Sequence, residues 1–158
     1  TAMQIALPSV YGTMVQLGFI VPSLEIAVDS WLARGGGPFF EMRHVSLPKQ
    51  TYRGAPTNVD MSVAIGYSGT IQLELIEQHD DSPSLYRDFL RETPEGGLHH
   101  VAFMSPRYDE ALAHATAAGT PVVQERERPL HPRHTQAGTC EDLVDDPSAT
   151  CSVDSEAA

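Results

Sequence analysis

No stretch of apolar residues in the 158-residue sequence is long enough to cross a bilayer, so no membrane-spanning helix is predicted. Basic residues are also scarce: 10 Lys and Arg stand against 21 Asp and Glu, and the formal net charge is -11. Because phosphate contacts need clustered Lys and Arg, this balance argues against a nucleic-acid partner. Residues 1–4 lack the basic start and apolar stretch of a signal peptide, and we expect a cytoplasmic protein.

The two cysteines, Cys140 and Cys151, are too few to form a disulfide framework. Their spacing also differs from the Cys-x-x-Cys pattern of a zinc knuckle. We therefore expect two reduced thiols, with a local disulfide or a weak metal site as the alternatives.

Hydrophobic residues make up 41% of the sequence, which is enough to build a buried core. Alternating or clustered apolar residues predict strands over residues 14–21, 39–47, 59–67, 70–78, 98–104 and 122–127. Apolar residues at helical spacing predict helices over residues 24–34, 84–91 and 106–118, and Ser23 is a natural N-cap for the first of them. Residues 48–58 are predicted to form a polar loop.

A unit of strand, helix, glycine and strand begins near residue 14 and again near residue 98, which indicates two duplicated modules of an α+β protein. We therefore divide the chain into an N-terminal extension (1–13), a first module with a trailing helix (14–95) and a second module (96–158). From His134 to the end there are six acidic residues and no Lys or Arg, which is typical of a poorly ordered tail. The last two strands of the second module would have to lie there, near residues 131–139 and 149–155.

Two segments of the sequence resemble a known family. The first is Gln16-Leu-Gly-Phe-Ile-Val-Pro-Ser-Leu-Glu25, and the second contains Gln72-Leu-Glu-Leu-Ile76, Asp81-Ser-Pro83 and Gly96-Gly-Leu-His-His-Val101. They resemble the vicinal oxygen chelate (glyoxalase/bleomycin resistance/dioxygenase) superfamily, and within it the proteins similar to methylmalonyl-CoA epimerase. The resemblance implies an α+β fold in which paired βαβββ modules form a curved mixed sheet around a cleft.

The resemblance also implies a divalent metal ion (Co, Mn, Ni, Zn or Mg), held by one side chain from each of four strands. By position these ligands fall on Gln16, Glu74, His100 and Asp154, with Glu141 as the rival for the fourth place. Imidazole, carboxylate and amide oxygen together suit such an ion in an open octahedral site. The alternatives are a buried core histidine at position 100 and a carboxylate on the solvated sheet face at position 74.

The sequence departs from the family pattern at two places. Gln16 stands where a histidine is usual, and an amide oxygen is a poorer ligand than imidazole for zinc-like ions. The loop Leu47-Pro-Lys-Gln-Thr51 lacks the glutamate that serves the epimerase as a base. The base could instead be Glu74, His44 or His99. Because strand side chains alternate, His99 is expected on the sheet face opposite to that of His100.

The function that these features favour is a metal-dependent lyase or isomerase acting on a small carbonyl compound or thioester through an enediolate-type intermediate, with Glu74 and His99 as catalytic residues. The alternative is a small-molecule binding protein of the same fold that needs no metal and acts by sequestration. A ring-cleaving dioxygenase ranks third, because only His100 and Glu74 of its two-histidine, one-carboxylate iron site are in place. The resemblance also implies a homodimer.

Overall fold

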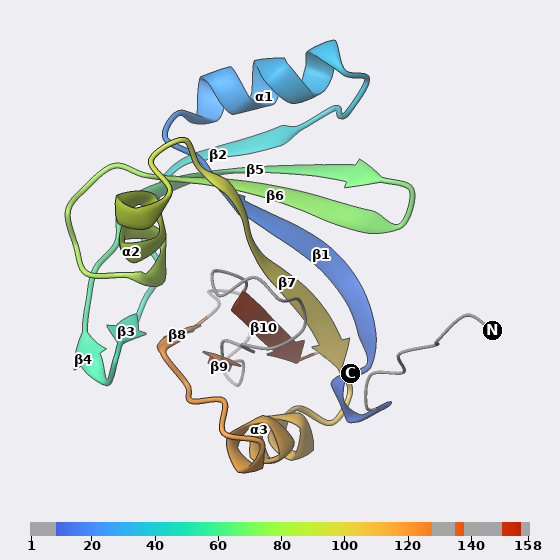
Figure 1. Ribbon diagram of the computed structural model, residues 1–158, viewed down its shortest axis with the longest axis vertical. Helices are drawn as coiled ribbons and strands as arrows, with labels where there is room; N and C mark the ends of the chain where they lie inside the picture. The colour runs from blue at the N-terminus through green and yellow to red at the C-terminus, as the bar shows by residue number, and fades with distance from the viewer. Residues whose placement is uncertain (1–8, 128–134, 138–149, 156–158) are drawn as a thin grey trace.

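The computed structural model describes residues 9–127, 135–137 and 150–155 (Figure 1). The predicted α+β fold with a curved mixed sheet is confirmed. The elements in chain order are η1 (Ser9–Tyr11), β1 (Thr13–Ile20), α1 (Leu24–Ala33), β2 (Phe40–Val45), β3 (Thr51–Tyr52), β4 (Ala55–Pro56), β5 (Met61–Ser68), β6 (Ile71–Gln78), α2 (Leu85–Glu92), β7 (Gly97–Ser105), α3 (Tyr108–Ala117), β8 (Gln124–Glu127), β9 (Thr135–Ala137) and β10 (Thr150–Ser155).

The ten strands of the described residues form one sheet with the order β2-β5-β6-β1-β7-β10-β9-β8-β3-β4. At its centre β1 and β7, the first strands of the two predicted modules, pair antiparallel. On the outer side of each lies a parallel neighbour, β6 beside β1 and β10 beside β7. Figure 1 shows the sheet bending away from this central pair in both directions. Because one sheet runs through both halves of the chain, the division near residue 95 stays a prediction.

The segment 48–58, expected to be a loop, contains a short hairpin of β3 and β4 instead. Arg53 and Gly54 form its turn with φ angles of 49° and 77°, the left-handed backbone of tight hairpin turns. An arginine rarely adopts this conformation. Of the two turn residues, only Gly54 therefore matches the Asn-Gly or Asp-Gly pattern that predicts such a hairpin. The hairpin pairs with β8, and it thereby joins the first half of the chain to the far end of the sheet.

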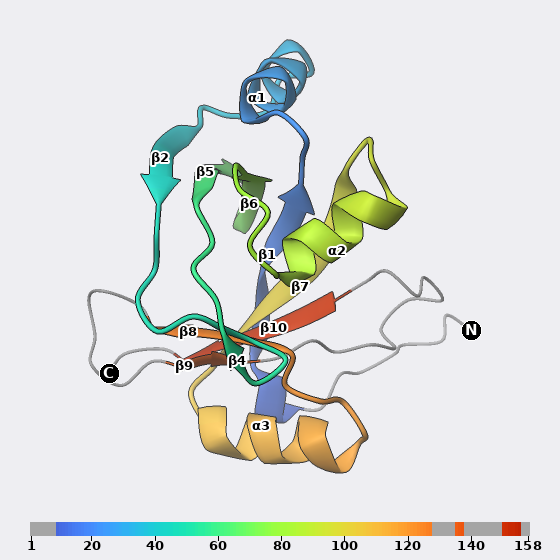
Figure 2. The ribbon, with the colours of Figure 1, turned by 90° about the vertical axis from the view of Figure 1, so that its left-hand side faces the viewer.

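The two sheet faces are covered by different helices. On one face Leu24 and Val28 of α1 pack against Ala64 and Leu75. On the other face Tyr86 and Phe89 of α2 pack in a cluster with the strand residues Ile20, Val59, Met61, Val63 and Ile76. In Figure 2, α1 and α3 lie at opposite ends of the molecule, with β1 and β7 running between them. The face that carries α2 also carries the candidate site.

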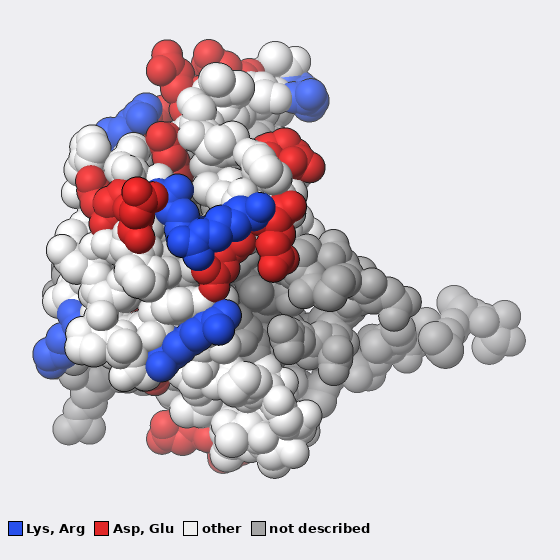
Figure 3. All heavy atoms as spheres, turned by 60° about the vertical axis from the view of Figure 1, so that its left-hand side comes forward, with Lys and Arg blue, Asp and Glu red and all other residues white. Residues whose placement is uncertain are grey.

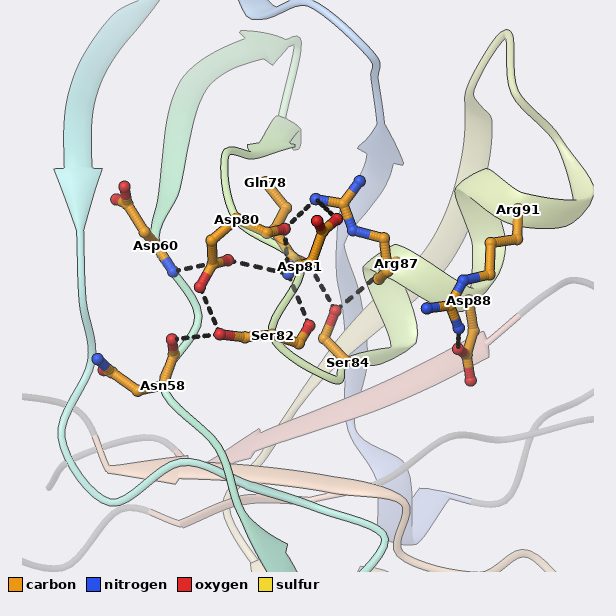
Figure 4. Close-up of polar contacts among 10 residues, drawn as sticks. All are labelled: Asn58, Asp60, Gln78, Asp80, Asp81, Ser82, Ser84, Arg87, Asp88 and Arg91. Atoms are coloured by element: carbon orange, nitrogen blue, oxygen red, sulfur yellow. Dashed lines mark hydrogen bonds and ion pairs between the residues drawn. The ribbon is translucent and has the colours of Figure 1, made fainter.

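A polar network fixes the start of α2 (Figure 4). The Ser84 hydroxyl is fully buried; it accepts the Arg87 backbone N–H at 3.0 Å and donates to Gln78 Oε1 at 2.5 Å. The Gln78 amide in turn donates to the Ser82 carbonyl at 2.8 Å and to Asp80 at 3.1 Å. The loop before α2 is therefore held by side-chain hydrogen bonds, and this sets where the aromatic side chains of α2 lie over the sheet.

Charged side chains on this side of the molecule are mostly paired. Arg53 and Arg91 both contact Asp88, and Arg87 contacts Asp81. Figure 3 shows blue and red side chains lying beside one another on this face. In the described part of the chain, no helix has the length and apolar character needed to span a bilayer.

The two helix caps give a matched test of this network. We expect Ser84→Ala to lower the free energy of unfolding by about 2 kcal/mol, because it removes a cap and leaves the buried Gln78 oxygen without its donor. Ser23→Ala removes the exposed, longer cap of α1 (3.4 Å) and should cost less than about 1 kcal/mol. Urea unfolding measures both variants. Equal losses would contradict a special role for Ser84.

Candidate functional site

The strand register aligns Glu74, Gly18 and His100 in one row across β6, β1 and β7. Gly18 pairs directly with Glu74 on one side and with His100 on the other. Directly paired residues of neighbouring strands present their side chains on the same sheet face. The register therefore places two of the predicted ligands on one face, separated only by a residue without a side chain.

Glu74 and His100 are in contact. Nε2 of His100 lies 3.3 Å from Oε2 of Glu74, and the two side chains are only 10% and 9% exposed. An unpaired carboxylate at this depth would be costly, and the imidazole supplies its partner. The alternative, a carboxylate on the solvated sheet face at position 74, is thus not the arrangement in the structure.

Gly18 makes this contact possible. The imidazole ring of His100 lies over the Gly18 Cα, in the space where a Cβ would sit. Any larger residue would overlap the ring and push it away from Glu74. The sequence contains this glycine within the family-like segment. Only the strand register shows that the His100 imidazole packs directly against Gly18.

A β-bulge precedes each of the first and third predicted ligands. On β1 Val15 is the extra residue before Gln16, and on β7 His99 is the extra residue before His100. A bulge sets two residues of one strand opposite one residue of its partner and re-aims the side chains. Strict alternation therefore fails at His99, and the expected placement of His99 on the opposite face is wrong.

His99 lies instead beside His100, under α2. Its Nδ1 is 3.0 Å from Nδ1 of His100, and its ring contacts those of Tyr86 and Phe89 at centroid distances of 5.9 and 5.1 Å. Burial, together with the charge of His100, lowers the pKa of His99 to about 3. A neutral imidazole can donate or accept at Nδ1, depending on its tautomer. His99 can therefore form a hydrogen bond with Nδ1 of His100 in both tautomers of His100: the one in which Nε2 carries the proton and the one in which Nε2 has a free lone pair.

Gln16 belongs to the next row of the same face. Its Nε2 donates to Oε1 of Gln72 at 2.6 Å, and Nε2 of Gln72 donates to the Tyr67 hydroxyl at 2.8 Å. The hydrogen bond engages the Gln16 nitrogen, so the carbonyl oxygen is the atom available as a ligand. Gln72 is a residue that sequence reasoning missed, because nothing in the strand pattern distinguished it from any other polar position.

The fourth predicted ligand is placed by backbone register alone. Asp154 of β10 aligns with Met104, whereas Thr150 aligns with His100 and Ser152 with Ala102. In the first half of the chain, Glu74 pairs with Gly18, which lies two residues after Gln16. In the second half, the residue two positions after His100 is Ala102, and it pairs with Ser152 of β10. Glu141 lies outside the described residues.

The Glu74–His100 pair fits a divalent ion. Two ligand atoms at about 2.1 Å from an ion, at a right angle, lie about 3 Å apart, close to the 3.3 Å between His100 Nε2 and Glu74 Oε2. Among the described residues no group of three or more His, Cys, Asp and Glu side chains could hold a metal. A third protein ligand from this part of the chain would thus be the Gln16 amide oxygen.

His44, the other candidate base, lies away from this pair. Its Nδ1 is 3.0 Å from Asp60, its ring stacks on His79 at 4.4 Å, and its backbone N–H donates to Ser62. Ser62 alternates along β5 with side chains of the site face, so this cluster is on the opposite face of the sheet. The geometry therefore does not bring His44 to Glu74.

Residues 15–137 match the family model of the Glyoxalase/Bleomycin resistance protein/Dioxygenase superfamily. The match covers well over half of the chain, and the chain belongs to this superfamily. The bulges, the contact of His100 with Gly18 and the Glu74–His100 pair are thus features of one of its members. No curated protein sequence matches the chain.

Solved structures with the same fold are distant in sequence. A hypothetical protein from Bacillus halodurans has 15% identity and a TM-score of 0.61, over 92% of this chain and 95% of its own. Methylmalonyl-CoA epimerase from Mycobacterium tuberculosis has 14% identity and a TM-score of 0.59, over 98% and 94%. A mutant of 4-hydroxymandelate synthase from Streptomyces coelicolor has 14% identity and a TM-score of 0.59, over 92% and 49%. At these identities the likeness shows the fold alone.

Substitution of Gly18 tests whether it forms the floor beneath His100. We expect Gly18→Ala to lower the free energy of unfolding by about 1–3 kcal/mol, because the new methyl group overlaps the imidazole. In a His100→Ala background the same change should cost less than about 1 kcal/mol, because the overlapping ring is absent. A double-mutant cycle by urea unfolding measures the coupling. Additive effects would contradict the proposed contact.

Burial of His99 predicts a loss of stability in acid. The folded chain keeps His99 neutral down to about pH 3, whereas the unfolded chain takes up that proton near 6.5. The unfolded state then binds more protons between these values, so stability falls as the pH drops below 6.5, by up to about 1.4 kcal/mol per pH unit. Urea midpoints of metal-free protein from pH 7.5 to 4.5 should fall less steeply for His99→Phe than for the wild type. Parallel curves would refute this role of His99.

Proposed function

We propose that the chain is a metal-dependent isomerase or lyase that moves a proton next to a carbonyl group of a small carbonyl compound or thioester. The observation that carries this proposal is the buried contact of His100 Nε2 with Glu74 Oε2, at a separation that suits two adjacent positions on one ion. The chain's membership of a superfamily that includes such enzymes supports it.

The proposed ligands are Gln16, Glu74 and His100, with Asp154 as the fourth and Glu141 as its rival. When bound, the divalent ion (Co, Mn, Ni, Zn or Mg) supplies Lewis-acid stabilisation of an enediolate. His100 would bind the ion through Nε2, while its Nδ1 is held by His99. The Gln16 amide nitrogen donates to Gln72, so Gln16 would bind through its carbonyl oxygen.

Glu74 is the proposed base. Oε2 is the oxygen next to His100 Nε2, so the other carboxylate oxygen takes the proton from the carbon beside the carbonyl, and the electron pair of the broken C–H bond moves to the carbonyl oxygen. Return of the proton to that carbon or to its neighbour completes an isomerisation. His99 is buried and has a pKa near 3, so it is a weak base, and its proposed part in catalysis is to position His100.

A second function is supported by the same contact. Glu74 and His100 satisfy each other directly, so the pair is stable without an ion, and a metal-free protein that binds a small molecule fits this arrangement. The ring-cleaving dioxygenase is the third candidate, because only His100 and Glu74 of its two-histidine, one-carboxylate iron site are in place. For either of the first two functions the partner is a small molecule, and a homodimer in the cytoplasm stays a proposal.

Metal content separates the first two functions. Protein purified without chelator should bind about one divalent ion per chain. His100→Ala and Glu74→Gln should each weaken binding about 100-fold or more, since even supporting residues of metal sites contribute 10–100-fold. His114→Ala is the matched control. His114 lies on α3 and forms a hydrogen bond with the Tyr11 hydroxyl, so its substitution should leave metal binding unchanged. Equally low metal in all four proteins would favour the metal-free function.

Proton exchange tests the reaction. In D₂O the metal-loaded protein should exchange the proton beside the carbonyl in at least one member of a panel of thioesters and carbonyl compounds, including methylmalonyl-CoA, which is in the name of one structural neighbour. NMR follows the exchange. We expect Glu74→Gln to slow it by about 100-fold or more, as loss of a catalytic base or of a transition-state contact does. Exchange that persists in Glu74→Gln would exclude Glu74 as the base.

A further inference from the structure

Exposed apolar side chains continue the row of the candidate site toward the edge of the sheet. Phe40 of β2 pairs with Ile65 of β5, and Ile65 pairs with Glu74. Phe40 is 69% exposed, although it lies on the same face as the buried Glu74–His100 pair. A single residue, the apolar Ile65, thus separates Glu74 from an exposed phenyl ring.

Phe40 is not isolated. Met42 is 37% exposed two residues further along β2, and Tyr67 is 58% exposed two residues beyond Ile65 on β5. By register these side chains share the site face, and we call Phe40, Met42, Ile65 and Tyr67 the edge patch. Single exposed apolar residues are ordinary, whereas contiguous ones mark a binding surface.

A chain of hydrogen bonds joins the edge patch to the site. The Tyr67 hydroxyl accepts from Gln72, and Gln72 accepts from Gln16, the proposed amide ligand. Tyr67 thus presents its ring to the edge patch and its hydroxyl to the polar row of the site. The edge patch and the site therefore lie side by side on one face of the sheet, with exposed apolar side chains at the edge and the buried carboxylate and imidazole further in.

We propose that the edge patch binds an apolar tail of the substrate, while the carbonyl end of the same molecule lies at Glu74 and His100. Phe40 is two strands away from Glu74, a distance of about 10 Å across the sheet. A tail of about eight carbon atoms spans this distance. This inference rests on the proposed function for the position of the reacting end, and it adds the class of substrate: a carbonyl compound or thioester with an aliphatic or aromatic tail.

A second copy of the chain is the other occupant to consider, because β2 is an edge strand of the sheet. A dimer contact through that edge would need its backbone groups and would not require apolar side chains beside Glu74. The alignment of Phe40 with the catalytic row is what favours the substrate.

The test uses two hydroxamates that share one metal-binding head and differ in the tail, acetohydroxamate and octanohydroxamate. Calorimetry with nickel-loaded protein should show at least about ten-fold tighter binding of octanohydroxamate, since burial of even two or three methylene groups gives this gain. Phe40→Ser should remove most of the gain and leave acetohydroxamate binding unchanged. Ile26→Ser is the matched control, because Ile26 is also exposed (73%) but lies on α1, at the other face.

The outcomes separate this inference from the proposed function. Equal affinity for both compounds, with binding lost in His100→Ala, would overturn the tail site and leave the metal-dependent function standing. A preference for the octanoyl tail that depends on Phe40 but not on metal or His100 would support the tail site and count against that function. Absence of octanohydroxamate binding would overturn the tail site. So would a dimer, detected by light scattering, that Phe40→Ser dissociates without changing the preference between the two tails.

Discussion

The antiparallel pairing of β1 with β7 is the constraint on which the site depends. It brings Gly18 opposite His100, and the parallel partner β6 brings Glu74 to the other side of the same glycine. A shift of that register by one residue would turn the imidazole to the opposite face. The bulges at Val15 and His99 each lie one residue before a proposed ligand, Gln16 and His100, and flank this short stretch. These matching positions are consistent with the predicted duplication.

The sequence predicted the three helices, the long strands, the fold and the meeting of Glu74 with His100, because alternation and family-like segments are local properties of a strand. It did not predict the neighbours of His99, since a bulge depends on how two distant strands pair, and strict alternation gave the wrong face. The β3–β4 hairpin was missed for a related reason: Arg53 adopts a left-handed conformation that its side chain does not favour. Gln72 was missed because its importance comes from Gln16, which lies on another strand.

The electrostatics of the site combine few charges with deep burial. Glu74 and His100 lie 3.3 Å apart, and an apolar layer from α2 packs against the neighbouring His99. A divalent ion would need a deprotonated Nε2 on His100 and an ionised carboxylate on Glu74, so metal affinity would depend on pH at this site. The polar loop before α2 contributes indirectly, because Ser84 and Gln78 set where that apolar layer lies.

The pairing of β3 with β8 has a consequence for the order in which the protein folds. Thr51 pairs with Glu125, and β5, β6, α2, β7 and α3 lie between them in the chain. Contacts between residues so far apart in sequence are slow to form, because the entropy of closing the intervening loop is lost before the contact is made. We therefore expect the hairpin to pair with β8 late in folding, after the rest of the sheet, and to be among the first pairings to open when the native state fluctuates.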